Sequence, residues 1–149
     1  MYTIAENTDY KELTYLFYDN GLEITPGIER PSNGVKCWSC RNSINQDLIG
    51  GASLEMRNGH FVVADVAVNI EFRQKKIGTR LMNLIEEEII KRGGNEAWLV
   101  AKAPDLYIKL GWEVVTREQA PDISKCFSCI KYGKECNPQI LHKKHFEIS

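Results

Sequence analysis

A predicted strand, a basic loop and a predicted helix follow one another between residues 62 and 92, and this succession restricts the folds open to the chain. Valine and isoleucine dominate residues 62–70, as in a buried strand. From Ile77 to Ile89, apolar residues recur at helical spacing and fall on one face. Between these elements, residues 73–78 read Arg-Gln-Lys-Lys-Ile-Gly. A loop of this kind at a helix start presents unpaired backbone N–H groups and the positive end of the helix dipole, which together bind phosphate.

The basic loop resembles the acetyl-CoA loop of the GNAT superfamily of N-acetyltransferases, whose pattern is Arg/Gln-x-x-Gly-x-Gly/Ala, with Arg73 first and Gly78 last. Lys76 stands where the pattern has its middle glycine. If that position needs a positive φ, lysine is strained there, although its N–H still donates. A second segment, Leu-Tyr-Ile-Lys-Leu-Gly-Trp at residues 106–112, is similar to the family's Phe-Tyr-x-Lys-Leu-Gly-Phe and follows in the same order. The resemblance covers residues 48–116 well and the rest of the chain loosely or hardly at all.

This resemblance implies an α/β fold of the GNAT-like acyl-CoA N-acyltransferase type. Its sheet would be mixed and mostly antiparallel, split around the cofactor, with helices on both faces. We expect residues 1–149 to form a single acetyltransferase domain, with a cysteine-containing C-terminal extension from about residue 117. A chain of 149 residues is long enough to bury its own core.

Local signals predict the order of the other elements. Thr8 or Asp9 caps the start of a helix, with Glu12 three residues after Asp9 completing a capping-box pattern, and the helix ends at Asn20-Gly21. Asn58-Gly59 predicts a hairpin turn before the central strand. Strands are predicted over residues 2–5, 35–41, 48–56, 96–101 and 112–116, and a short helix over 104–111.

Two further segments have alternative interpretations. Residues 22–34 carry proline, glycine, serine and asparagine, which predicts a loop. In similar proteins this region borders the acceptor site, but a plain connector is an equal alternative. In the long helix, Glu87 with Lys91 and Glu88 with Arg92 form i, i+4 pairs, and we expect this charge run to be a solvated helix face.

The resemblance assigns cofactor contacts to the loop and to the strand before it. The pantetheine arm would pair with the strand backbone, which requires that strand to splay from residues 96–101. A backbone N–H near Val68 would donate to the thioester oxygen. A solvated basic patch is the alternative for the loop's charges. The cofactor-binding residues predicted are Val66, Ala67, Val68, Arg73, Gln74, Lys75, Lys76, Ile77, Gly78 and Thr79.

Two residues are candidates for catalysis. Tyr107 matches the tyrosine that, in many similar enzymes, protonates or hydrogen-bonds the leaving sulfur; the alternative is a core tyrosine with a satisfied hydroxyl. Asp65 is an ionisable residue in an apolar strand, so it needs a partner or a task. It could take the proton of the incoming ammonium or only cap a neighbouring group, and the identity of the general base stays open.

The cysteines leave a metal site undecided. Cys126, Cys129 and Cys136 have spacing that suits a tetrahedral ion or an iron–sulfur cluster. A fourth ligand could come from Cys37, Cys40 or His142. Against this, Cys37 and Cys40 lie in a predicted strand, where their odd separation points them to opposite faces. Reduced structural or redox-sensitive thiols are the alternative.

Charge and composition restrict the partners. A formal net charge of −1 gives no reason to expect nucleic acid. The sequence has neither a signal peptide nor a run of about 20 apolar residues, so we expect a cytoplasmic protein without a membrane partner. The oligomeric state stays open, and a homodimer is compatible with the sequence.

The resemblance therefore implies an N-acetyltransferase that moves an acetyl group from acetyl-CoA to a primary amine, by direct attack in a ternary complex. The acceptor is a small-molecule or peptide amine whose identity the sequence leaves open. The alternative is a non-catalytic acyl-CoA-binding or thiol- or metal-responsive regulatory module on the same fold.

Overall fold

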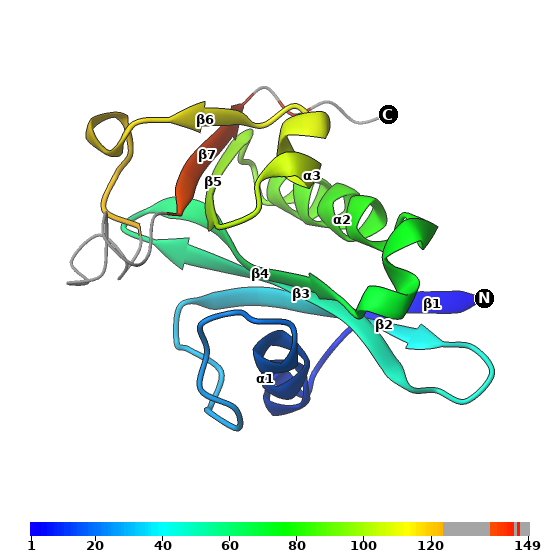
Figure 1. The fold of residues 1–149 in the computed structure, drawn as a ribbon. Coiled ribbons are helices and arrows are strands. Elements are labelled where there is room, and N and C mark those ends of the chain that lie inside the picture. The colour runs from blue at the N-terminus through cyan, green and yellow to red at the C-terminus, as the bar shows by residue number, and fades with distance from the viewer. Residues whose placement is uncertain (124–137, 145, 147–149) are drawn as a thin grey trace. The chain divides into compact units, whose positions relative to one another are not determined.

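The computed structural model describes residues 1–123, 138–144 and 146. Its strands form a seven-stranded sheet in the order β1-β2-β3-β4-β5-β7-β6 (Figure 1). The sheet is mixed and carries helices, which confirms the predicted α/β class. The chain divides into two compact units: Met1–Glu55 with Val63–Ile85, and Met56–Val62 with Glu86–Ser149.

The first unit begins with a short strand and a capped helix. The Asp9 side chain accepts a hydrogen bond from the Glu12 N–H at 3.4 Å, as the capping pattern predicts. Asn20 ends this helix, and Gly21 follows with a φ of 85°. The elements that contribute to this unit are β1 (Tyr2–Glu6), α1 (Tyr10–Asp19), β2 (Gly34–Asn42), β3 (Leu48–Arg57), β4 (His60–Val68), η1 (Ile70–Lys75) and α2 (Ile77–Lys91).

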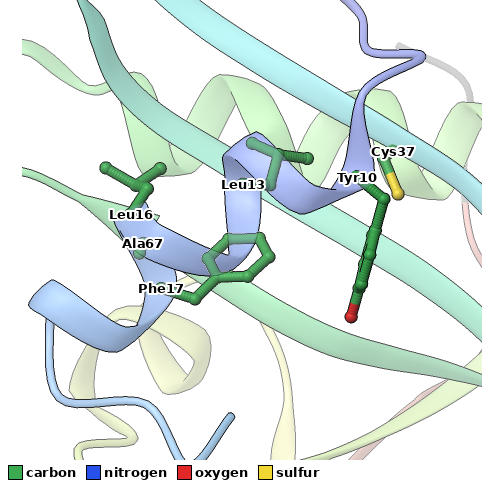
Figure 2. Close-up of a cluster of buried hydrophobic side chains, with 6 residues drawn as sticks. All are labelled: Tyr10, Leu13, Leu16, Phe17, Cys37 and Ala67. Carbon is green, nitrogen blue, oxygen red and sulfur yellow. The ribbon is translucent and has the colours of Figure 1, made fainter. Parts of the chain in front are cut away.

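Two adjacent glycines of β3 show that α1 and α2 cover opposite faces of the sheet in this unit. A Cβ on Gly51 would lie 2.5 Å from Leu13 Cδ2 of α1. A Cβ on Gly50 would lie 3.3 Å from Ile77 Cγ2 of α2. Successive strand residues point to opposite faces, so the predicted helices on both faces are confirmed here. Figure 2 shows the cluster on the α1 face, which comprises Tyr10, Leu13, Leu16, Phe17, Cys37 and Ala67.

The second unit contains a strand that the sequence does not predict. β7 pairs antiparallel with both β5 and β6. Only Ile140 and Leu141 are buried apolar residues of β7, and polar residues flank them. Such a short apolar run carries little periodicity, and its pairing partners are distant in sequence. The elements of this unit that follow α2 are β5 (Glu96–Ala101), α3 (Asp105–Lys109), β6 (Glu113–Val115), η2 (Arg117–Gln119) and β7 (Gln139–Lys144).

The prediction of a solvated charged face on α2 is only partly right. Glu87 is exposed, but Glu86 and Glu88 are buried. The Glu88–Arg92 pair forms as predicted, with Nε and Oε2 2.7 Å apart. Glu86 of α2 is buried and forms an ion pair with Lys143 of β7. None of the helices in the described part of the chain is long and apolar enough to cross a membrane.

Candidate active site

The basic loop has the shape of an anion cradle. Residues Ile70–Lys75 form the 3₁₀ helix η1, and α2 starts at Ile77. Lys76 joins them in the left-handed conformation, with φ 61° and ψ 23°. The position therefore does need positive φ, and lysine is strained there by about 1–2 kcal/mol. The first-turn N–H groups of α2 lack intrahelical partners, so they are the donors that fit a diphosphate.

The loop side chains differ in their surroundings. Ile77 is completely buried and anchors the start of α2 in the core, so only its backbone can bind a ligand. Gly78 and Thr79 are half-buried, whereas the preceding loop residues are exposed. The exposed residues are Arg73, Gln74, Lys75 and Lys76.

The guanidinium of Arg73 is held by protein acceptors. Its Nε donates to the Val68 carbonyl at 2.9 Å, and one terminal nitrogen donates to Asn20 Oδ1 at 3.1 Å. Asn20 Nδ2 in turn donates to the Leu16 carbonyl at 2.9 Å and to Asn69 Oδ1 at 3.0 Å. We call Asn20, Asn69 and Arg73 the Asn20 network. Asn20 was predicted only as a helix end, because the sequence does not reveal which residue its amide meets.

Tyr2 makes a second contact with the loop that the sequence does not predict. Its hydroxyl donates to the Lys75 carbonyl at 3.2 Å. The guanidinium carbon of Arg80 lies 5.4 Å from the centre of the Tyr2 ring, which is a cation–π distance. The first strand thus helps to fix the loop and the start of α2.

An open surface pocket lies beside the Asn20 network, with a volume of about 410 Å³. It is lined by Asp19, Asn20, Asn69, Ile70, Glu71 and Arg73. The loop that follows α1 folds back onto this helix, since the Gly27 N–H donates to Thr14 Oγ1 at 2.7 Å.

The predicted strand residues lie in β4. Asp65 has a partner, because Ser53 Oγ donates to its Oδ2 at 3.0 Å. Ala67 packs in the cluster under α1 (Figure 2), whereas Val66 and Val68 are half-buried. These residues and the loop belong to the first unit.

Tyr107 belongs to the second unit, where it lies half-buried in α3. Its carbonyl accepts a hydrogen bond from the Trp112 N–H at 3.0 Å, which closes the C-terminal end of this short helix. Lys143 Nζ donates to the Leu110 carbonyl at 2.8 Å and also binds both carboxylate oxygens of Glu86, at 3.0 and 3.1 Å. A buried ion pair thus holds the end of the helix that carries Tyr107.

The cysteine prediction is tested only in part. Cys126, Cys129 and Cys136 lie outside the described residues. Cys37 packs in the cluster on the α1 face, whereas Cys40 lies near Gly50 on the α2 side, so the two point to opposite faces as predicted. Burial raises the pKa of both thiols to about 11.

His142, another candidate ligand, lies in β7. Its ring stacks on that of Trp98 with the centroids 4.0 Å apart. Burial lowers the pKa of His142, although Glu96, with Oε1 3.7 Å from Nε2, acts in the opposite direction. Within residues 1–123, 138–144 and 146, no three histidine, cysteine or acidic residues group to hold a metal ion.

A mixed sheet with helices, and a basic loop at the start of α2, fit the class of acyl-CoA-dependent transferases. The model of the acetyltransferase (GNAT) family matches residues 3–112, and the chain belongs to this family. It is therefore an acyltransferase, and its acyl donor is acetyl-CoA.

Solved structures of other acetyltransferases share the fold. A GNAT-family acetyltransferase from Staphylococcus aureus Mu50 has a TM-score of 0.70 at 16% identity, with 98% of this chain and 100% of that chain covered. The ribosomal-protein-S18-alanine N-acetyltransferase from Escherichia coli has a TM-score of 0.68 at 17% identity, with 100% and 97% covered. An aminoglycoside 6'-N-acetyltransferase, crystallised with coenzyme A, has a TM-score of 0.67 at 15% identity, with 99% of each chain covered. No curated protein sequence matches the chain.

Proposed function

We propose that this enzyme transfers the acetyl group of acetyl-CoA to a primary amine, by direct attack within a ternary complex. The observation that carries the proposal is the loop conformation: left-handed Lys76 between η1 and the first turn of α2. In this arrangement the backbone N–H groups of residues 76–79 bind the diphosphate, and the helix dipole favours its charge.

The pantetheine arm then runs along the backbone of Val66, Ala67 and Val68, and a backbone N–H near Val68 donates to the thioester oxygen. The amine nitrogen attacks the thioester carbon, the C–N bond forms and the C–S bond breaks. Asp65 takes the proton of the incoming ammonium, directly or through water. Tyr107 gives a proton to the departing sulfur and takes one back from the acylated nitrogen, directly or through water, so the products are the acetylated amine and free CoA.

A thiol-release assay over a panel of amines tests the reaction. Small metabolites, peptide N-termini, lysine side chains and amine drugs form the panel, because the sequence leaves the acceptor amine open. Release of CoA that depends on one class of amine is the expected result. Protein that binds acetyl-CoA but releases no CoA with any amine would instead be a non-catalytic acyl-CoA-binding module.

Substitution of Tyr107 by Phe tests its role. Tyr107→Phe should lower kcat roughly 10²–10⁴-fold and leave the Kd for acetyl-CoA nearly unchanged, because only the proton donor is lost. The loss should shrink with a thioester whose thiol leaves more easily. Tyr18→Phe, at an exposed tyrosine of α1, is the matched control and should keep full activity. If the rate and the cofactor affinity fell equally, Tyr107 would be a packing residue.

A further inference from the structure

The Asn20 network joins three segments that meet at the cofactor loop. Asn20 is the C-cap of α1, Asn69 is the N-cap of η1, and Arg73 lies within η1. The Leu16 carbonyl can only accept and the Arg73 guanidinium can only donate, so their positions fix the orientation of the Asn20 amide. The remaining Asn20 N–H then meets Asn69 Oδ1 at 3.0 Å. Both ends of the Asn20 side chain are therefore committed to defined partners.

The backbone around the network is fixed as well. The Asn69 N–H donates to the Ile49 carbonyl of β3 at 2.8 Å, and the Phe72 N–H donates to the Asn69 carbonyl at 2.8 Å. Arg73 Nε returns to the Val68 carbonyl, the last residue of β4. Hydrogen bonds of Arg73 and of the Asn69 backbone thus hold η1 to the end of β4. Arg73 lies three residues before left-handed Lys76.

We propose that Asn20 and Arg73 are positioning residues for acetyl-CoA binding, and that Arg73 acts through neutral acceptors rather than through its charge. They hold the loop in the conformation that directs the backbone N–H groups of residues 76–79 toward the diphosphate. Without them the loop must be ordered during binding, and this entropy cost lowers the affinity. The inference rests on the proposed function of the loop, and it adds the C-cap residue of α1 to the residues that support the cofactor site.

The network also connects the cofactor loop to the segment that follows α1. Asn20 lies directly before residues 21–33, which follow α1 and fold back on it through the Gly27–Thr14 hydrogen bond. A movement of this segment that displaces Asn20 therefore displaces the acceptor of Arg73. Binding of acetyl-CoA should in turn make the α1 end more rigid.

Calorimetry with CoA tests the proposal, because CoA is available while the acceptor is unidentified. Asn20→Leu and Arg73→Leu should each raise the Kd roughly tenfold, and the double variant should be no weaker than the weaker single variant, since both remove one network. Arg73→Gln still donates to one acceptor, and this conservative variant should stay within about threefold of the wild-type Kd.

Three controls separate positioning from general damage. Tyr18→Phe, at an exposed residue of α1 two positions before Asn20, should bind CoA normally. The salt dependence of the Kd should be the same in Arg73→Gln as in the wild type, because no charge contact with phosphate is lost. In the free protein, hydrogen exchange of the amides at residues 70–79 should be faster in Asn20→Leu, while the midpoint of unfolding changes little.

The outcomes that overturn the inference are distinct. An Asn20→Leu protein with the wild-type Kd would show that the network does not position the loop. A tenfold loss in Arg73→Gln with a weaker salt dependence would make Arg73 a direct phosphate ligand. Gly78→Asp is the reference variant, because it places a carboxylate in the cradle. If Gly78→Asp kept the wild-type Kd, the proposed cofactor site itself would be wrong, whatever Asn20→Leu does.

Discussion

Removing the ammonium of Lys143 should destabilise the second unit strongly. The Lys143 and Glu86 side chains are only 23% and 11% exposed, and Nζ makes all three hydrogen bonds described above. Lys143→Met keeps a long apolar side chain but leaves the Glu86 carboxylate buried without its cation. Breaking one partner of a buried ion pair costs about 3–5 kcal/mol, and partial exposure of Lys143 favours the lower end. We expect a loss of about 3 kcal/mol in the free energy of unfolding.

The double variant Glu86→Leu/Lys143→Met distinguishes this cause from lost packing. It removes both charges together, and buried ion pairs replaced by apolar residues are often neutral in stability. We expect it to unfold within about 1 kcal/mol of the wild type. Lys144→Met, at the exposed neighbour on the same strand, is the control and should change the free energy by less than about 0.5 kcal/mol.

Urea denaturation followed by tryptophan fluorescence measures these differences, since Trp98 and Trp112 are both buried in the second unit. Circular dichroism should give the same transition, which establishes that unfolding is two-state. A double variant as unstable as Lys143→Met would refute the argument from the unpaired carboxylate. The Leu110 carbonyl loses its donor in both variants, so kcat should fall in both if this contact holds Tyr107 in place.

Three further predictions concern single groups. Lys76→Gly removes left-handed strain of about 1–2 kcal/mol but adds unfolded-state entropy worth about 0.5–1, so denaturation should show equal or slightly higher stability. Its affinity for acetyl-CoA should hold or improve; a large loss in calorimetry would mean that the ammonium binds phosphate. The pKa of His142 is lowered in the folded state, so the unfolded state binds more protons once the pH falls below about 6.5. Urea titrations at pH 7.5 and 5.5 should therefore show a larger acid loss for the wild type than for His142→Phe, which keeps a ring against Trp98; equal losses would contradict this. With a pKa of about 11, only about one thiol in three thousand of Cys37 or Cys40 is ionised at pH 7.5. Peptide mapping after iodoacetamide treatment should find both unmodified in the native protein, and rapid alkylation would argue against their burial.

The sequence predicts those parts of the fold whose determinants are local. The Asp9 cap, the Asn58-Gly59 turn and the helical spacing after Ile77 each depend on residues within one or two turns of each other. Asn58 and Gly59 have φ values of 50° and 80°, as a two-residue hairpin turn requires. The sequence also predicts the strain at Lys76, because the family pattern has glycine at this position and glycine is favoured where φ is positive.

Features that depend on distant pairing are not predicted. β7 is formed by pairing with β5 and β6, and its own residues supply only two buried apolar side chains. Helical spacing places Glu87 opposite the apolar face of α2 and Glu86 at the edge of that face, and Glu86 is buried. The spacing does not show that Glu86 meets Lys143 of β7, which lies 57 residues later in the chain.

The family motif identifies Arg73 as a residue of the cofactor loop, but it does not show whether Arg73 acts as a cation or as a hydrogen-bond donor. The sequence predicts that Arg73 belongs to the cofactor-binding loop, and in the structure its guanidinium donates to two neutral acceptors, Val68 O and Asn20 Oδ1. The family pattern accepts either arginine or glutamine at this position. These two side chains share hydrogen-bond donors and differ in charge, so a position open to both requires a donor more than a cation. The hydrogen bonds of Arg73 therefore give a physical reason why the family pattern accepts arginine or glutamine. If this reason is correct, Arg73→Gln should bind CoA with nearly the wild-type Kd, whereas Arg73→Leu should bind more weakly.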